Sequence, residues 1–157
     1  MNLNSLPITY QGVIPESYLD EMGHMNVMWY GHLFSCATGE IFKLVGLTRT
    51  YFESNQAGTF ALEQHIRYLA EVRAGQKVSM RTRLVGRSAK LFHFIHFLVN
   101  DSTGALAATG ESIGAHIDMR IRRTSPLPPE ITALYDRLLA QHQALEWKPP
   151  LCGAMKC

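Results

Sequence analysis

The sequence has little of what marks a secreted, membrane-bound or nucleic-acid-binding protein. Its three cysteines include no C-x-x-C pair, which argues against a disulfide framework and against a zinc knuckle. No apolar run approaches the roughly 20 residues of a membrane span, and the opening MNLNSLPITY lacks the basic start and apolar block of a secretory signal. A net charge of +2 is too small to indicate nucleic-acid binding. We therefore expect a cytoplasmic protein without a membrane or nucleic-acid partner.

Motifs for several kinds of active site are also missing. The chain contains no G-x-S-x-G elbow, no G-x-G-x-x-G or P-loop glycine motif and no H-E-x-x-H zinc motif. His93 and His96 are three apart in a predicted strand, so their side chains point to opposite faces and cannot share an ion. We interpret both as half-buried polar positions, and Cys36, in an apolar helix, as packing. We expect neither a metal site nor a bound cofactor.

The composition is that of a single globular domain, with 157 residues of which 46% are hydrophobic and 18% charged. Apolar residues recur at spacings of three and four from residue 28 to residue 45, which predicts a long helix with one buried face. Gly46 stands where such a helix would end.

Residues 60–68 and 77–85 alternate between apolar and polar, and residues 91–100 form a nearly continuous apolar run between turn residues, which predicts strands after this helix, with one more before it. The predicted strands cover residues 8–14, 60–68, 77–85, 91–100 and 105–121. Short turns join the last three of these strands, which predicts an antiparallel meander. The last strand is rich in Gly, Ala and Ser, which suits a surface pressed against the helix or another subunit. A helix is expected at about 129–146 and a loose tail at 147–157.

This order of elements predicts an α+β fold in which one antiparallel sheet wraps around one long central helix. The whole chain, 1–157, then forms one domain with a core at about 8–128. The far face or the edge of the sheet needs a cover. A homodimer that pairs edge strands would supply it, and a homotetramer is equally open.

The stretch DEMGHMNVMWYG has the residues for acyl-transfer chemistry. Asp20 ends the first strand region, Gly23 allows a tight turn, and the helix starts near Val27 or Met28 with unpaired N–H groups. A helix N-terminus stabilises negative charge. A carboxylate beside it can attack or activate water while a free N–H polarises the acyl oxygen.

A structural interpretation of the same stretch is equally open from the spacing. Asn26 can be the N-cap of the helix, and Asp20 and Glu21 can merely favour the helix dipole, because such residues are enriched at helix starts.

The run VIPESYLDEMGHMNVMWYGHLFSCATGEIFKLVGL resembles the opening of hotdog-fold acyl-CoA thioesterases of the 4-hydroxybenzoyl-CoA thioesterase family, with its D-x-x-G-H-x-N signature. Asp20, Gly23, His24 and Asn26 fill that signature, and the resemblance extends over residues 8–128. It implies a hotdog fold and hydrolysis of an acyl-CoA substrate without metal or cofactor.

The resemblance also implies roles for single residues. Asp20 matches the catalytic carboxylate, which acts as nucleophile or general base on the thioester carbonyl. His24 and Asn26 shape the turn or hold water and substrate. The N–H that polarises the thioester comes from the first helical turn, here Val27 or Met28.

Family active sites lie at dimer interfaces, so the resemblance implies further residues from a neighbouring strand, possibly of the other subunit. Glu63 is the candidate catalytic residue there, and His65 is the candidate substrate-binding residue. The alternative for Glu63 is an exposed strand carboxylate paired with Arg67.

Two sets of residues are candidates for binding the substrate. The acyl group would meet a methionine-rich apolar lining and two aromatic side chains, although Tyr30 lies on the apolar stripe of the helix and packing is expected for at least one of the pair. The acyl-binding candidates are Met22, Met25, Val27, Met28, Trp29 and Tyr30. Basic residues at chain turns would meet the phosphates of coenzyme A. The candidates are Arg87, Lys90, Arg122 and Arg123.

Two rival functions keep the same fold. An enoyl-thioester hydratase or dehydratase would need a histidine and an acid, and His24 with Glu63 would have to serve. A non-catalytic acyl-thioester-binding protein would retain the fold without the activity, and the intact signature weighs against it.

Overall fold

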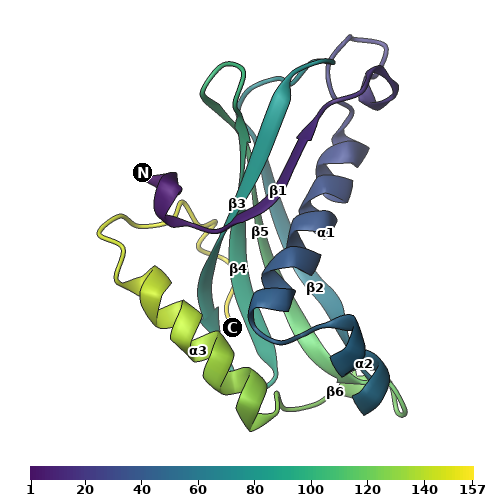
Figure 1. Ribbon diagram of the computed structural model, residues 1–157, viewed down its shortest axis with the longest axis vertical. Coiled ribbons are helices and arrows are strands. Elements are labelled where there is room, and N and C mark those ends of the chain that lie inside the picture. The colour runs from purple at the N-terminus through teal and green to yellow at the C-terminus, as the bar shows by residue number, and fades with distance from the viewer.

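A computed structural model describes residues 1–157, and its centre is a six-stranded sheet with one long helix lying along it (Figure 1). The strands are β1 (Ile8–Val13), β2 (Ala57–Tyr68), β3 (Lys77–Arg87), β4 (Leu91–Asn100), β5 (Ala105–Asp118) and β6 (Arg123–Thr124). The helices are α1 (Val27–Leu44), α2 (Arg49–Asn55) and α3 (Pro129–Gln143), with single turns η1 (Leu3–Ser5) and η2 (Glu16–Tyr18). None of the helices has the length and apolarity needed to cross a membrane.

The sheet is antiparallel throughout, with the strand order β1-β3-β4-β5-β2 and the short β6 beside β5. The predicted meander of β3, β4 and β5 is confirmed. Strand β2 forms one edge of the sheet, and none of its 12 residues is buried. This open edge leaves a row of backbone groups without a partner in the chain.

Helix α1 begins and ends where the sequence predicts. The side chain of Asn26 caps it by accepting a hydrogen bond from Met28 N–H at 2.9 Å, and the helix ends at Leu44, two residues before Gly46. Its buried face follows the predicted spacing and consists of Tyr30, Leu33, Phe34, Ala37, Ile41 and Phe42. Burial of this stripe, rather than helix propensity, holds the helix in place.

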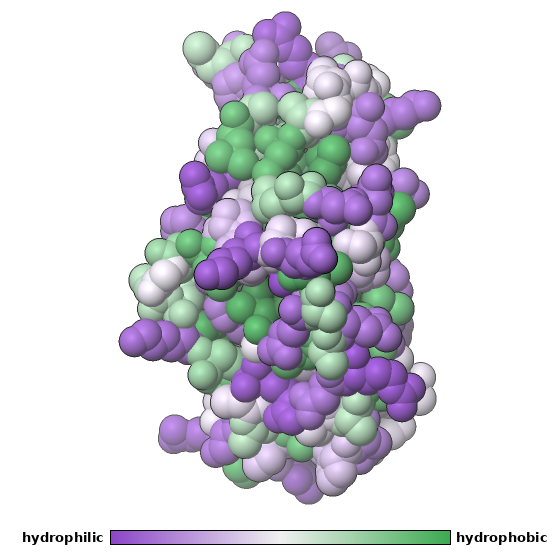
Figure 2. All heavy atoms as spheres, turned by 90° about the vertical axis from the view of Figure 1, so that its left-hand side faces the viewer, coloured by the Kyte–Doolittle hydropathy of each residue, from purple (hydrophilic) through white to green (hydrophobic).

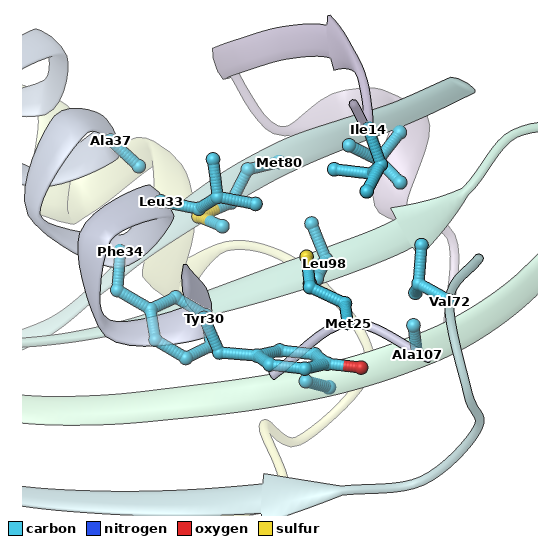
Figure 3. Packing of buried hydrophobic residues seen from close by; sticks show 12 residues of the cluster. Ile14, Met25, Tyr30, Leu33, Phe34, Ala37, Val72, Met80, Leu98 and Ala107 are labelled. Atoms are coloured by element: carbon cyan, nitrogen blue, oxygen red, sulfur yellow. The ribbon is translucent and has the colours of Figure 1, made fainter. Parts of the chain in front are cut away.

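The inner core lies between α1 and the concave face of the sheet. Figure 3 shows Leu33 of α1 close to Met80 of β3, with Leu98 of β4 beneath them. Towards the end of α1 a second cluster joins Phe42 and Leu84 to Tyr135 of α3, which is fully buried. Because α3 contributes to this cluster, the core extends beyond the predicted limit near residue 128.

Strand β5 has glycines where aromatic rings lie against its backbone. A Cβ atom at Gly110 would lie 3.0 Å from the ring of Phe34, and one at Gly114 would lie 2.3 Å from the ring of Phe92. Separations this short leave no room for a side chain at Gly114 unless the ring moves. Of the two predicted partners of this small-residue strand, the helix or another subunit, the structure shows the helix at Gly110.

A chain of buried polar side chains crosses the inner face of the sheet. Thr9 Oγ1 lies 2.7 Å from Thr82 Oγ1, Thr82 Oγ1 lies 2.7 Å from His96 Nδ1, and His96 Nε2 lies 2.9 Å from Thr38 Oγ1 on α1. Complete burial lowers the pKa of His96 to about 3. The interpretation of His93 and His96 as half-buried was wrong, since they are 5% and 0% exposed. Hydrogen bonds compensate the cost of that burial.

The C-terminal residues 147–157 cover the outer face of the sheet, so the predicted loose tail is wrong. Arg83 donates to the carbonyl oxygen of Trp147 at 2.7 Å, and its guanidinium lies 4.3 Å from the centre of the indole ring. Met155 is 7% exposed. Figure 2 views the molecule from the side where α3 lies and shows polar side chains over its lower part and a group of apolar ones above.

Two further differences concern the region after α1. The sequence predicts no helix or strand between Gly46 and residue 60, but Thr48 Oγ1 accepts from Tyr51 N–H at 3.2 Å and starts the short helix α2. Strand β2 begins at Ala57 rather than near residue 60, and its register with β5 shifts at a bulge between Ala61 and Glu63. The bulge breaks the predicted alternation, which extended unbroken through this strand.

The buried histidines predict loss of stability in mild acid. Burial lowers the pKa of His96 to about 3 and of His142 to about 4, whereas an unfolded histidine titrates near 6.5. The unfolded chain therefore binds protons that the folded chain does not, so the free energy of unfolding falls as the pH drops below about 6.5. We expect a loss of roughly 2 kcal/mol per histidine between pH 6.5 and pH 5.

Urea unfolding at both pH values measures this loss, with His142→Gln as the test variant and the exposed His65→Gln as its control. The same pH dependence in wild type and His142→Gln would contradict the assignment to His142.

Candidate functional site

A tight turn fixes the carboxylate of Asp20. Gly23, at φ 80°, donates from its N–H to the carbonyl oxygen of Asp20 at 3.0 Å, and Asp20 N–H donates to the carbonyl oxygen of His24 at 3.0 Å. Asp20 Oδ1 accepts from Met22 N–H at 2.9 Å, and Oδ2 lies 3.4 Å from His24 Nδ1. The carboxylate is thus oriented by its own turn, while its side chain stays 25% exposed.

The start of α1 leaves one backbone donor beside this turn. The side chain of Asn26 accepts a hydrogen bond from Met28 N–H, and its carbonyl oxygen accepts one from Trp29 N–H, both at 2.9 Å. These bonds leave Val27 N–H as the first-turn donor without a protein acceptor. Asn26 is therefore the N-cap, and of the two predicted donors Val27 is the one that a ligand can use. Asp20 and Asn26 line the same surface depression of about 690 Å³.

Three apolar side chains are exposed around this depression and the helix start. Met22, Val27 and Met28 are 80%, 62% and 63% exposed. Met25 is only 2% exposed and belongs to the inner core, and it also lines a depression of about 410 Å³ together with His24 and Val27. Glu21 is exposed, as expected for a residue outside the chemistry.

Both predicted aromatic residues take part in packing. The indole of Trp29 stacks on the ring of Tyr18 with centroids 3.6 Å apart. Tyr30 is 4% exposed, and its ring packs edge to face with the ring of Tyr68, with centroids 4.9 Å apart. Burial raises the pKa of Tyr30. The expectation that at least one of the pair packs in the core is confirmed for Tyr30. Tyr30 also lines the depression of about 410 Å³ beside the helix start, so its predicted role in binding an acyl group stays a prediction.

A cavity of about 200 Å³ lies between the second half of α1 and strands β2, β4 and β5. Its lining combines four phenyl rings with hydroxyl and amide groups and contains no charged side chain. The aromatic residues are Phe42, Phe60, Phe92 and Phe94, and the polar ones are Ser35, Thr38, Thr59, Gln64 and Ser112. Sequence reasoning assigned none of these residues to the site. The available signal was polar Ser35 and Thr38 beside the apolar stripe of the helix.

Hydrogen bonds hold the polar groups of this cavity in place. Thr38 Oγ1 donates to the carbonyl oxygen of Phe34 and lies within 2.9 Å of His96 Nε2. Gln64 Nε2 donates to Ser112 Oγ at 3.3 Å across β2 and β5. The buried polar chain that starts at Thr9 thus ends in the wall of the cavity.

Glu63 and His65 point away from the cavity and from α1. The bond from Gln64 to Ser112 places Gln64 on the inner face, and neighbouring residues of a strand point to the opposite face. Within one chain Glu63 and His65 thus lie on the face away from α1, and their predicted roles, which include a site shared with the other subunit, stay predictions. Within one chain Glu63 forms no pair with His24, which a hydratase would need, and no ion pair with Arg67.

Arg87 is not free to bind a phosphate. Its guanidinium donates two hydrogen bonds to the carboxylate of Asp136 on α3, at 2.5 and 2.6 Å. These bonds hold the pKa of the Asp136 carboxyl below its usual value. The structure therefore gives Arg87 a structural role instead of the predicted one.

The other basic candidates lie at the surface. Arg122 places its guanidinium 5.4 Å from the ring centre of Phe60, which lines the cavity. Lys90 and Arg123 are exposed and form no ion pair. Arg122 is thus the basic residue that the structure brings next to a cavity-lining ring.

Comparison with known proteins identifies the family. The model of the thioesterase-like superfamily matches residues 14–134. The chain belongs to this superfamily. It is 30% identical over 137 residues to a betainyl-CoA thioesterase of Pseudomonas aeruginosa, covering 87% of this chain and 86% of that protein.

A longer relative is 33% identical over 126 residues, the L-carnitine dehydrogenase/betainyl-CoA thioesterase of Agrobacterium fabrum. The match covers 80% of this chain but only 26% of that protein. The chain therefore spans about a quarter of the length of this two-function relative.

Solved structures share the fold over nearly the whole chain. A Staphylococcus aureus protein described in complex with CoA superposes with a TM-score of 0.85 at 21% identity, covering 97% of this chain and 96% of that one. A putative thioesterase of Pseudomonas putida KT2440 superposes with a TM-score of 0.80 at 26% identity, covering 97% of both chains. The predicted hotdog fold and the class of acyl-CoA thioester hydrolase are confirmed, whereas the 4-hydroxybenzoyl-CoA family in particular is not what these matches identify.

Removing the cap of α1 is expected to weaken both the helix and the turn that holds Asp20. Asn26→Ala leaves Met28 N–H without an acceptor and should lower the free energy of unfolding by about 1 kcal/mol. Asn26→Asp keeps a capping oxygen and serves as the control, with urea unfolding as the measurement. Equal destabilisation by the two variants would show that the cap is not what Asn26 contributes.

Proposed function

We propose that the protein hydrolyses an acyl-CoA thioester to the free acid and coenzyme A, with Asp20 as the reacting carboxylate. The observation that carries this proposal is the position of the Asp20 carboxylate, which Met22 N–H holds beside the start of α1. Val27 N–H at this helix start has no acceptor in the protein. Membership of the thioesterase-like superfamily supports the reaction type. The names of the relatives add that acyl-CoA compounds are the substrates of such proteins.

The first step uses both groups. Val27 N–H and the positive end of the α1 dipole polarise the carbonyl oxygen of the thioester. Asp20 takes a proton from a water molecule while the water oxygen bonds to the carbonyl carbon. The carbonyl π electrons move to the oxygen, where the helix end stabilises the negative charge.

Collapse of this intermediate breaks the carbon–sulfur bond, and the thiolate of coenzyme A leaves and takes up the proton. In the alternative route Asp20 itself attacks the carbonyl carbon, forming a mixed anhydride that water then hydrolyses. Both routes need the same carboxylate in its ionised form. His24, with Nδ1 at 3.4 Å from Asp20 Oδ2, helps to hold that carboxylate in place.

Each site in this proposal is built from two copies of the chain. Asp20 and Val27 lie before and at the start of α1, whereas the cavity touches that helix at Ser35, Thr38 and Phe42. Fifteen residues separate Val27 from Phe42, or about 22 Å at 1.5 Å per residue. An acyl group in the cavity is therefore far from Asp20 of the same copy.

Pairing of the β2 edges of two copies would bring Asp20 of one copy to the cavity of the other. Tyr68, the last residue of β2, contacts Tyr30 in the first turn of α1. The cavity contacts Thr59 to Ala61, near the beginning of the same strand. Antiparallel pairing about a two-fold axis brings the end of one β2 next to the beginning of the other. Asp20 of one copy would then face the cavity of its partner, and a homodimer or a tetramer of such dimers would complete the site.

The cavity favours a small acyl group without negative charge. Its volume is about 200 Å³, and its lining offers no cationic side chain to pair with an anionic group. Four phenyl rings supply π faces, which attract cations such as a quaternary ammonium. We therefore propose a short acyl group with a neutral or cationic end, and the betainyl group named for the relatives is a candidate. Arg122, beside Phe60, would meet the phosphates of coenzyme A, with Lys90 and Arg123 as further candidates.

The test is thiol release from purified protein with betainyl-CoA, acetyl-CoA, benzoyl-CoA and succinyl-CoA. Asp20→Asn removes the basic oxygen but keeps the shape of the turn, so the release rate should fall by at least about 100-fold. The neighbouring exposed acid supplies the matched control, and Glu21→Gln should retain wild-type activity.

Equal rates for wild type and Asp20→Asn on every substrate would overturn the assignment of Asp20. A preference for the anionic succinyl group would instead contradict the proposed substrate class, and it would leave the role of Asp20 intact.

A further inference from the structure

A second group of reactive side chains lies on the outer face of the sheet, away from α1. Glu111 of β5 is 2% exposed, and no lysine or arginine pairs with it. Its Oε1 lies 2.8 Å from His93 Nε2, and its Oε2 accepts from Cys152 N–H at 2.6 Å. A carboxylate has room for further bonds beyond these two.

Two more potential ligands meet this carboxylate. His65 lies opposite Glu111 in the pairing of β2 with β5, and the tail brings the thiol of Cys152 alongside. One ligand atom from each of His65, Glu111 and Cys152 lies within 4.8 Å of the other two. Three distant segments of the chain therefore converge on one point.

We propose that His65, Glu111 and Cys152 form a site for a divalent transition-metal ion, with Zn²⁺ as the natural occupant. Imidazole, carboxylate and thiolate are the ligands that Zn²⁺ takes in tetrahedral sites, whereas Mg²⁺ and Ca²⁺ require oxygen ligands. This inference is independent of the proposed thioesterase function.

The geometry needs only small side-chain movements. Bonds of about 2.0 to 2.3 Å place the ligand atoms of a tetrahedral site about 3.5 Å apart. The side chain of His65 is exposed and that of Cys152 half-buried, so both can turn towards Glu111. Water would complete the coordination, and His93 would orient the carboxylate from behind.

A bound ion would join the tail to the sheet. Cys152 belongs to the C-terminal residues, His65 to the exposed edge strand and Glu111 to the buried strand beside it. Metal loading should therefore protect residues 147–157 from proteolysis.

The chain offers a matched control. Cys36 Sγ lies 3.7 Å from His32 Nε2 on α1, which is a second thiol–imidazole pair. No third ligand accompanies that pair, since His65, Glu111 and Cys152 form the only group of three potential ligands.

The experiment titrates tag-free, reduced full-length protein with Co²⁺, whose bond to a thiolate gives a charge-transfer absorption. Wild type and Cys36→Ser should show the absorption with one ion per chain, and Cys152→Ser should lose it. Loss of even an outer-shell partner weakens metal binding by about 10- to 100-fold, so His65→Ala should weaken it at least tenfold.

Circular dichroism confirms that each variant is folded. Absence of the absorption in wild type would overturn the proposal. Its persistence in Cys152→Ser together with loss in Cys36→Ser would also overturn it, because the ion would then sit at the helix pair.

Discussion

The packing of α1 along the sheet determines where every functional group lies. A helix of 18 residues runs about 27 Å, and it lies with its apolar stripe on β3, β4 and β5. Its start holds the donor at Val27 beside Asp20, and its second half forms one wall of the cavity. Because the helix is rigid, these two functions are separated by most of its length. The open edge of β2 is the place where a second copy can join them.

The polar contacts of the inner face show how this packing is specified. Hydroxyl groups and His96 form a continuous buried chain from β1 to α1. Such a chain has few alternative arrangements, because any shift of the helix leaves buried polar groups unsatisfied. Gly110 and Gly114 add a second restriction, since the rings of Phe34 and Phe92 fill the space above them. Together they fix the height and the register of α1 on the sheet.

Most of the fold could be predicted from the sequence because local patterns encode it. The spacing of apolar residues in α1, its Asn26 cap and the turns of the meander all depend on neighbours in the chain. The wrong predictions depend on distant contacts instead. The tail packs because Arg83 and Glu111 hold it, and the bulge after Ala61 in β2 is set by its pairing with β5.

The candidate site follows the same division. Asp20 and its turn could be recognised from one short motif, whereas the cavity takes its lining from four separate elements and has no linear signature. The burial of Met25 was not predicted, because a loop has no periodicity from which burial can be read. The cluster of His65, Glu111 and Cys152 also has no linear signature, because its residues are far apart in the sequence and metal motifs are recognised by short spacings.

Subunit mixing tests most directly whether Asp20 of one copy serves the cavity of another. One chain carries Asp20→Asn, and the other carries Ser35→Trp, which fills the cavity from its exposed wall. Each variant alone should be inactive, and co-expression should restore roughly a quarter of the wild-type activity, because random pairing makes half of the dimers mixed with one intact site each. No recovery in mixed dimers that are shown to form would contradict the account and place the whole site within one chain.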